Sequence, residues 1–404
     1  MNSLRKLLDR ARPSFEPGGR FGAFHSVFEG IESFLFSSKE TAKPGMTHVH
    51  DALDSKRIMT TVIIALMPCF LFGMYNTGYQ HWLAAGETTF PFFSLLFYGF
   101  LKVLPLVVVT YLVGLGIEFT VAQIRGEEIQ EGFLVSGILI PMILPVETPL
   151  WMVAVATAFA VIFAKEVFGG TGYNVFNVAL VTRAFLFFAY PASMSGDSAF
   201  IPAGKAFGFG PAVADGFSCA TPLGQIATSS SENFIVTGVN GEPVSTWDAF
   251  LGLIPGSFGE TSLLCIALGA AFLLITRIVD WRIIVAVVLG AIGMSAIANY
   301  FATPTYPNSY LTPLDQFLYG GLAFGAVFMA TDPVTAARTK TGKWIYGILI
   351  GVIAIIIRTY NNGYPEGAML AILLMNAFAP LIDWCVVQVN VKRRLKRTIA
   401  KNLE

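Results

Sequence analysis

The chain has 404 residues, of which 54% are hydrophobic and 13% charged, and its 26 basic residues balance 26 acidic ones. Soluble domains carry about 25% charged residues, and the apolar residues here form runs close to the roughly 20 residues that cross a bilayer. The composition indicates an integral membrane protein with the lipid bilayer as a partner. The zero net charge gives no reason to expect a nucleic-acid partner. The four cysteines lie far apart and form no zinc or iron–sulfur motif.

The chain opens with a polar, basic segment, residues 1–57, which lacks the apolar core of a signal peptide. Leu4, Leu7 and Leu8 recur at helical spacing beside basic residues. This pattern is typical of an amphipathic helix on a membrane surface and equally of a solvated tail. We expect the segment to be cytoplasmic.

About ten apolar segments follow, five before and five after a long interval at residues 192–260. They lie near residues 58–75, 92–117, 132–144, 149–166 and 175–191, and then near 261–278, 281–301, 317–331, 344–360 and 366–386. The third and eighth are short and end near prolines, Pro141 and Pro145 in one and Pro333 in the other. Proline breaks a helix, and helices broken at matching places in two halves point to a site near the middle of the membrane.

The distribution of Lys and Arg predicts the orientation, because these residues collect on the cytoplasmic side. The tail, residues 387–404, is basic like the N-terminal segment. Both termini are therefore expected in the cytoplasm, which requires an even number of spans. Loops 76–91 and 301–316 contain no Lys or Arg, and the interval 192–260 carries one Lys against six acids. We expect these three loops to face outward.

The two halves of the chain resemble each other at an offset of 193 residues, which aligns Trp151 with Trp344 and Lys165 with Arg358. The halves are residues 58–191 (membrane repeat 1) and residues 261–386 (membrane repeat 2). A duplicated unit of five spans inserts upside down the second time, because five is odd. The sequence thus predicts an all-α integral membrane protein of about ten transmembrane helices in two inverted five-helix repeats with broken short helices.

Two loops carry candidate chemistry. The stretch 165–177, Lys-Glu-Val-Phe-Gly-Gly-Thr-Gly-Tyr-Asn-Val-Phe-Asn, is rich in glycine and is followed by Arg183. Glycines let a backbone approach a ligand closely, and charges at membrane depth are usually functional. A tight turn with a lysine that reaches the interface fits the same residues. The stretch 215–221, Asp-Gly-Phe-Ser-Cys-Ala-Thr, is either an ordinary loop of small residues or a flavin-attachment site.

The stretch 215–221 resembles the signature Asp-x-x-Ser/Thr-Gly-Ala-Thr, in which a separate flavin transferase esterifies the last threonine with the phosphate of FMN. Cys219 stands where that signature has glycine. Other motifs resemble the B-subunit family of the sodium-translocating NADH:quinone reductase. They lie at residues 15–19, 56–59, 73–76, 164–172, 183–191, 329–333, 342–351 and 364–367. The homologous D subunit of the Rnf complex shares the core, and the N-terminal Phe-Glu-Pro-Gly-Gly favours the quinone reductase.

The resemblance implies a subunit that passes electrons from a covalent FMN to a non-covalent riboflavin and on to ubiquinone, coupled to the export of Na⁺. It implies a six-subunit complex in the bacterial inner membrane, with a flavin transferase as a partner during maturation. By resemblance, Thr221 holds the FMN phosphoester, and Asp215 and Ser218 belong to the motif that the transferase reads. Asn174 and Asn177 are implied as riboflavin ligands.

The resemblance also implies a quinone region at Gly114 and Glu118, where Leu115 departs from the family pattern Gly-Gly-x-x-Glu. The alternative for Gly114 is close helix packing. Asp332 and Asp383 match acids that the family uses in sodium coupling, and the alternative for both is the capping of helix ends.

A function of another class stays open on the residues alone. Inverted repeats with broken helices suit a solute channel or a secondary transporter equally well. The Asp-x-x-Ser-x-Ala-Thr loop discriminates between the two, because a channel has no use for a flavin-attachment sequence. No GxGxxG motif follows a soluble strand, so a redox subunit of this sequence would receive its electrons from partner subunits.

Overall fold

The computed structural model describes residues 10, 12–13, 47, 55–126, 132–194, 196, 200–202, 204–213, 220–229, 234–361, 363 and 366–403, with side chains to Arg397. Within these ranges the regular structure is helical, and the extended pairings are two isolated β-bridges. Most of the expected N-terminal segment lies outside the described residues, as do Asp215 and Ser218 of the flavin motif.

The first half contains five α-helices. They are α3 (Ser55–Ala84), α4 (Phe92–Arg125), α5 (Phe133–Ile143), α6 (Leu150–Ala160) and α7 (Val178–Ala189). α6 continues into a π-helical segment, η2 (Val161–Lys165), and a 3₁₀ turn, η3 (Glu166–Phe168). The long interval that follows holds three short helices, α8 (Pro191–Met194), α9 (Pro222–Thr228) and α10 (Thr246–Leu251).

The second half again contains long helices with a broken region between them. Its elements are α11 (Leu263–Ile275), α12 (Trp281–Tyr300), η4 (Pro307–Tyr310), α13 (Asp315–Leu318), α14 (Leu322–Phe324), the π-helical η5 (Gly325–Met329), α15 (Lys340–Tyr360) and α16 (Ala368–Leu403). The predicted span at 317–331 is therefore three short pieces rather than one helix.

Among the described residues, six helices are long and apolar enough to cross a membrane. These are α3, α4, α6 with its extension to Phe168, α12, α15 and α16. α5, α7 and α11 are apolar but shorter, and the prediction that the third segment is short agrees with α5. The chain is a helical, multi-pass membrane protein.

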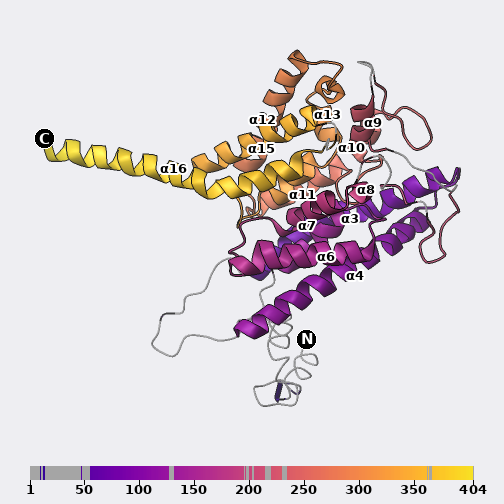
Figure 1. The fold of residues 1–404 in the computed structure, drawn as a ribbon, viewed down its shortest axis with the longest axis horizontal. Coiled ribbons are helices and arrows are strands. Elements are labelled where there is room, and N and C mark those ends of the chain that lie inside the picture. Colours follow the sequence, from indigo (N-terminus) through magenta and orange to yellow (C-terminus); the bar gives the residue numbers. More distant parts are fainter. Residues whose placement is uncertain are drawn as a thin grey trace.

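The last helix continues past the end of the predicted span. The sequence predicts that the span ends at residue 386 and that a basic tail follows, and α16 runs without interruption through this tail to Leu403. Residues 381–403 contain neither Gly nor Pro, so nothing in the backbone ends the helix, and Lys and Arg favour helix. Figure 1 shows α16 projecting beyond the other helices on the left.

Small residues bring neighbouring helices into close contact, as is common in membranes. A Cβ at Gly290 of α12 would lie 2.3 Å from the carbonyl oxygen of Ile348 in α15. On the α3–α4 interface, a Cβ at Gly99 would lie 1.9 Å from the carbonyl oxygen of Met74. These backbones touch directly, so the long helices form a rigid frame for the loops at their ends.

The loops gather at two ends of the frame. α9, α10 and α13 lie together toward the right in Figure 1, whereas the C-terminus of α16 lies on the left. Pro222 of α9 shares a pocket with Gly320, which follows α13. A second pocket joins Ile58 at the beginning of α3 to Gly132 before α5 and Pro333 after η5. Of the predicted site residues, Thr221 lines the first pocket, and Asn174, Asn177 and Asp332 line the second.

Candidate functional site

Thr221 caps the short helix α9. Its Oγ1 accepts a hydrogen bond from the Gly224 N–H at 3.3 Å, and its own N–H donates to the Gly196 carbonyl at 2.8 Å. Gln225 fixes the neighbouring backbone by donating to the Ala220 carbonyl at 2.9 Å. Thr221 is half-buried. The hydroxyl at the predicted FMN attachment point is therefore fixed in direction and partly accessible.

A small pocket joins Thr221 to buried charges. Thr221, Gly320, Glu260 and Glu366 are among the residues that line it. Arg183 of α7 donates through Nη1 to both carboxylate oxygens of Glu260, at 2.9 and 3.0 Å, and through Nη2 to the carboxylate of Glu366. A buried charge is tolerated only when it is paired and hydrogen-bonded, and Arg183 meets that condition with two carboxylates.

Arg358 of α15 belongs to the same cluster. It is 1% exposed. Its Nη1 donates to the backbone and side-chain oxygens of Gln316, at 2.6 and 2.9 Å, and its Nη2 donates to the carbonyl of Glu366 at 3.2 Å. Glu366 thus receives one arginine at its carboxylate and another at its backbone oxygen. The cluster connects α7 in the first half to α15 in the second.

Two glycines explain why the predicted eighth span is broken at this point. Gly320 has a φ of +79°, and a Cβ there would lie 2.6 Å from Leu223 and 3.2 Å from Nη2 of Arg358. A Cβ at Gly321 would lie 2.6 Å from the carboxylate of Glu260. Only glycine lets the backbone pass between α9 and the charged cluster, because it tolerates positive φ and needs no space for a side chain.

The pocket at the other end of the frame, called here the inner pocket, is lined by polar side chains on largely apolar walls. Its polar residues are Ser136, Lys165, Thr171, Asn174, Asn177, Thr331 and Asp332. Both π-helical segments contribute to it, η2 through Lys165 and η5 through Val327 and Phe328. Such segments often occur at functional sites. The predicted riboflavin ligands and one predicted sodium residue therefore line one pocket.

Asn177 and Asp332 connect the two halves of the chain in this pocket. The Oδ1 of Asn177 caps α7 by accepting from the N–H groups of Ala179 and Leu180, at 3.1 and 3.3 Å. Asp332, from the second half of the chain, lines the same pocket. Its carboxylate accepts from the N–H of Val334 at 3.0 Å and from the hydroxyl of Thr335 at 3.2 Å. Both residues thus have structural roles in addition to any part in binding.

The charges of the glycine-rich stretch do not pair with each other. Lys165 forms a buried ion pair with Glu118 of α4, while Glu166 faces Arg125, whose Nη2 donates to the Glu166 carbonyl at 2.6 Å. Lys165 is only 4% exposed, so the alternative of a lysine that reaches the membrane interface is wrong. Glu118, predicted to lie in the quinone region, is thus the partner of a lysine that lines the inner pocket, and its part in quinone binding stays a prediction.

Gly114, the other residue of the predicted quinone region, lies against α5. A Cβ at this position would lie 1.9 Å from the Phe133 ring, whereas a Cβ at Gly116 would meet nothing within 4 Å. Gly114 therefore serves helix packing in this structure. Its part in quinone binding stays a prediction.

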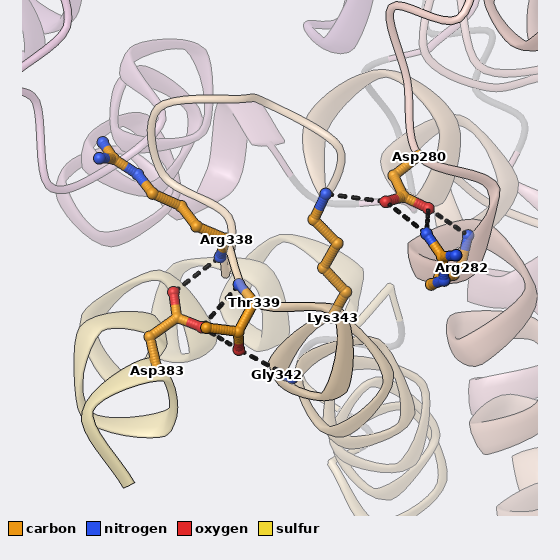
Figure 2. A network of polar contacts seen from close by, with 7 residues as sticks. All are labelled: Asp280, Arg282, Arg338, Thr339, Gly342, Lys343 and Asp383. Atoms are coloured by element: carbon orange, nitrogen blue, oxygen red, sulfur yellow. Dashed lines mark hydrogen bonds and ion pairs between the residues drawn. The ribbon is translucent and has the colours of Figure 1, made fainter. Parts of the chain in front are cut away.

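Asp383 of α16 binds the beginning of α15 (Figure 2). Its carboxylate accepts from the N–H groups of Arg338 and Thr339, at 2.7 and 3.0 Å, and from the Thr339 hydroxyl at 2.6 Å. This is the helix-capping arrangement that the sequence left open as an alternative. Among the residues that the structure describes, no three His, Cys, Asp or Glu side chains converge as a metal-binding group.

Beside it, Asp280 connects the beginnings of α12 and α15 (Figure 2). It accepts from Nζ of Lys343 at 2.8 Å and from the N–H of Arg282 at 3.0 Å. Burial by itself would raise the pKa of Asp280, but the hydrogen bonds from Lys343 and from the Arg282 N–H outweigh it, and the pKa lies below its usual value.

Sequence reasoning noticed Arg183 and Arg358 but missed their partners Glu260, Glu366 and Gln316. Acids and amides in loops are ordinary, so nothing local distinguishes them. A usable signal was present: two arginines near the ends of apolar segments require acceptors, and the loops at that end carry few charged residues.

Comparison with known proteins places the chain in a family. The model of the NQR2, RnfD, RnfE family matches residues 43–392. The B subunit of the Na(+)-translocating NADH-quinone reductase of Ectopseudomonas mendocina (strain ymp) is 43% identical over 98% of this chain and 100% of its own length. The proteins of that name from Haemophilus influenzae (strain PittEE) and Pseudomonas paraeruginosa (strain DSM 24068 / PA7) are each 42% identical over 98% of this chain and 99% of their own length. The chain therefore belongs to the NQR2, RnfD, RnfE family.

Proposed function

We propose that this chain is the membrane-embedded B subunit of a Na⁺-translocating NADH:ubiquinone reductase, which passes electrons through flavins to quinone and couples this to Na⁺ export. The observation that carries the proposal is the identity of 43% over 98% of the chain to a protein of that name. Companion subunits of a six-subunit complex supply the electrons, and the complex resides in the bacterial inner membrane.

Thr221 carries FMN as a phosphoester in this proposal, and Asp215 and Ser218 are read by the flavin transferase. The position of Thr221 supports this assignment, because its hydroxyl is half-buried and held at the beginning of a helix. Bound FMN supplies a redox-active ring that the chain itself lacks. The buried cluster of Arg183, Glu260 and Glu366 forms a fixed polar wall beside the attachment point.

The inner pocket holds riboflavin in this proposal, with Asn174 and Asn177 as ligands. Its apolar walls suit a flat ring and its amides suit the ring's polar edge. The side chain of Asn174 donates to the Phe176 carbonyl at 3.2 Å. This hydrogen bond fixes the orientation of the amide group. Asp332 stands in the same pocket and is proposed for the sodium path.

Ubiquinone is proposed to bind near Gly114 and Glu118. The ion pair from Glu118 to Lys165 supports a link between this region and the inner pocket. Asp383 is proposed for the sodium path on the resemblance alone. Its contacts add no support, since its carboxylate already accepts three hydrogen bonds within the chain.

The finer architecture is also proposed: two inverted five-helix repeats with both termini in the cytoplasm. One observation supports it. Lys165, which aligns with Arg358 in the repeat, lines the inner pocket near the C-terminal end of α6 and its extension. Arg358, near the C-terminal end of α15, contacts Glu366 beside the pocket of Thr221. The aligned segments thus end at different ends of the frame, as inverted repeats require.

Replacing Thr221 by Asn tests the flavin assignment. Asn is a good N-cap, so Thr221→Asn keeps α9 capped but has no hydroxyl to esterify. We expect the denatured variant to lose flavin fluorescence in an SDS gel while its membrane insertion stays normal. Thr228→Asn, in the same helix, is the matched control and should keep full fluorescence. Equal fluorescence of the Thr221 variant and the unmodified chain would refute the assignment.

A further inference from the structure

Lys165 has more hydrogen-bonding capacity than its partners use. Its side chain is 4% exposed. Within the described residues, its polar partner is the carboxylate of Glu118, and the Phe133 ring lies 6.0 Å from its Nζ. An ammonium group has three N–H donors. One is used by Glu118, and the face of an aromatic ring attracts the cation without accepting a conventional hydrogen bond from it.

The remaining donors of Lys165 have the inner pocket beside them, because Lys165 is one of its lining residues. Asn174 and Asn177 line the same pocket, and Asp332 is its other charged residue. Burying an ammonium at this depth is costly. A lysine needed only as the partner of Glu118 would gain nothing from bordering a cavity.

The local backbone explains how the side chain comes to this place. Lys165 ends the π-helical segment η2, where one extra residue is accommodated in the helix before the turn at Glu166–Phe168. The wider turn rotates the last residue relative to a regular α-helix. Lys165 can then border Glu118 on α4 and the pocket at once.

Resting on the proposed riboflavin site, we infer that Lys165 is a positioning residue whose ammonium donates a hydrogen bond to a carbonyl oxygen of the isoalloxazine ring, while Glu118 holds the ammonium in place. A cation at the ring stabilises the electron-rich reduced form more than the oxidised form. Lys165 therefore raises the midpoint potential of riboflavin. Because Glu118 shares the same cation, it lowers that potential, and the two residues act with opposite sign.

The test uses the full-length chain in lipid nanodiscs, on a Thr221→Asn background so that no covalent flavin contributes to the signal. Added riboflavin is the probe, its binding is followed by fluorescence quenching, and its potential by optical redox titration. We expect Lys165→Met to reduce the preference for reduced over oxidised riboflavin about tenfold, a fall of about 30 mV for a two-electron couple. Lys165→Arg should keep the midpoint potential of riboflavin close to that of the unmodified lysine, and Glu118→Gln should raise the potential.

Two further variants keep the result decisive. Lys165→Met leaves the buried Glu118 without its lysine, which by itself destabilises the fold. The double variant Lys165→Met/Glu118→Gln is therefore compared with Glu118→Gln, and the same tenfold fall is expected. Asn174→Ala should weaken riboflavin binding without the tenfold change in preference.

The outcomes separate the two ideas. If riboflavin binding depends on Asn174 but neither Lys165→Met nor Lys165→Met/Glu118→Gln lowers the potential relative to its reference chain, the role of Lys165 is overturned and the riboflavin site stands. If riboflavin binds equally to the chain with and without Asn174→Ala and Lys165→Met, the riboflavin site itself is wrong, and the role of Lys165 is overturned with it.

Discussion

Replacing Gly114 by Ala should destabilise the protein through a single contact. The new methyl group would lie 1.9, 2.1 and 2.7 Å from three atoms of the Phe133 ring. Phe133 is fully buried, with 0% exposure, and α4 and α5 pack along this face, so the ring cannot move out into solvent. Either the ring leaves its rotamer or the two helices move apart.

Overpacking of this kind typically costs about 1–3 kcal/mol. Gly116, two residues later in the same helix, provides the control, since a Cβ there meets nothing within 4 Å. Gly116→Ala should be neutral or slightly stabilising, because Ala favours helix over Gly by up to about 1 kcal/mol. The difference between the two variants isolates the contact with Phe133 from the change in helix propensity.

The assay is thermal unfolding of the purified chain in one detergent, for both glycine variants, Phe133→Ala and Gly114→Ala/Phe133→Ala. Phe133→Ala alone should cost about 3–5 kcal/mol. The double variant should be more stable than the sum of the single changes predicts, because the added methyl group fills the space that the ring leaves. Equal melting of Gly114→Ala and Gly116→Ala would refute the packing argument.

The same variants, assembled into the whole complex, address the quinone prediction. If Gly114 admits the quinone ring, a larger side chain should raise the apparent KM for quinone at normal flavin content. If packing is its whole role, protein yield and flavin content should fall, and the quinone dependence of the surviving enzyme should be unchanged.

Three other predictions follow from the structure. Asp383→Ala should lower the free energy of unfolding by about 1–3 kcal/mol, because the N–H groups of Arg338 and Thr339 lose their acceptor. Asp383→Asn keeps one acceptor oxygen and should cost less. A changed sodium dependence of activity in the Asn variant would contradict a purely structural role. Because its partners lower the pKa of Asp280, its contribution to stability should be complete above pH 3.8, the ordinary pKa, and should disappear as the pH falls below that value. The difference in melting temperature between Asp280→Asn and the unmodified chain should therefore shrink toward acid pH. A difference that grows toward acid pH would contradict this prediction. With the native cysteines replaced, a cysteine at the exposed Glu242 should be labelled from outside intact cells and one at the exposed Lys340 should not; the reverse pattern would overturn the proposed orientation.

Helix-forming segments could be predicted because they depend on the local sequence. Apolar runs of membrane length correspond to the long helices. Pro145 lies just beyond the end of α5, but Pro141 lies inside this helix and does not end it. The end of α16 was missed because a change from apolar to basic residues marks the end of the hydrocarbon but not the end of a helix. Nothing between Leu381 and Leu403 interrupts hydrogen bonding along the backbone.

Pairing was less predictable, because it depends on the tertiary arrangement. Lys165 and Glu166 are neighbours in the sequence, yet their partners are Glu118 and Arg125, more than 40 residues away. Adjacent residues on a helix point in different directions, so the sequence neighbour was a poor guide. The gathering of Asn174, Asn177 and Asp332 in one pocket was likewise visible only after folding, although family resemblance had singled out each of them.

The buried cluster around Arg183 has a consequence for how the protein is made. Its two carboxylate partners, Glu260 and Glu366, lie 77 and 183 residues further along the chain. At the usual rate of about 5–20 residues per second, a ribosome needs roughly 10–40 s to reach the second of them after the arginine. Glu260 becomes available after the first 77 residues of that interval, but Glu366 is still missing until its end. We therefore expect the guanidinium of α7 to reach its final set of partners only after α15 has been synthesised.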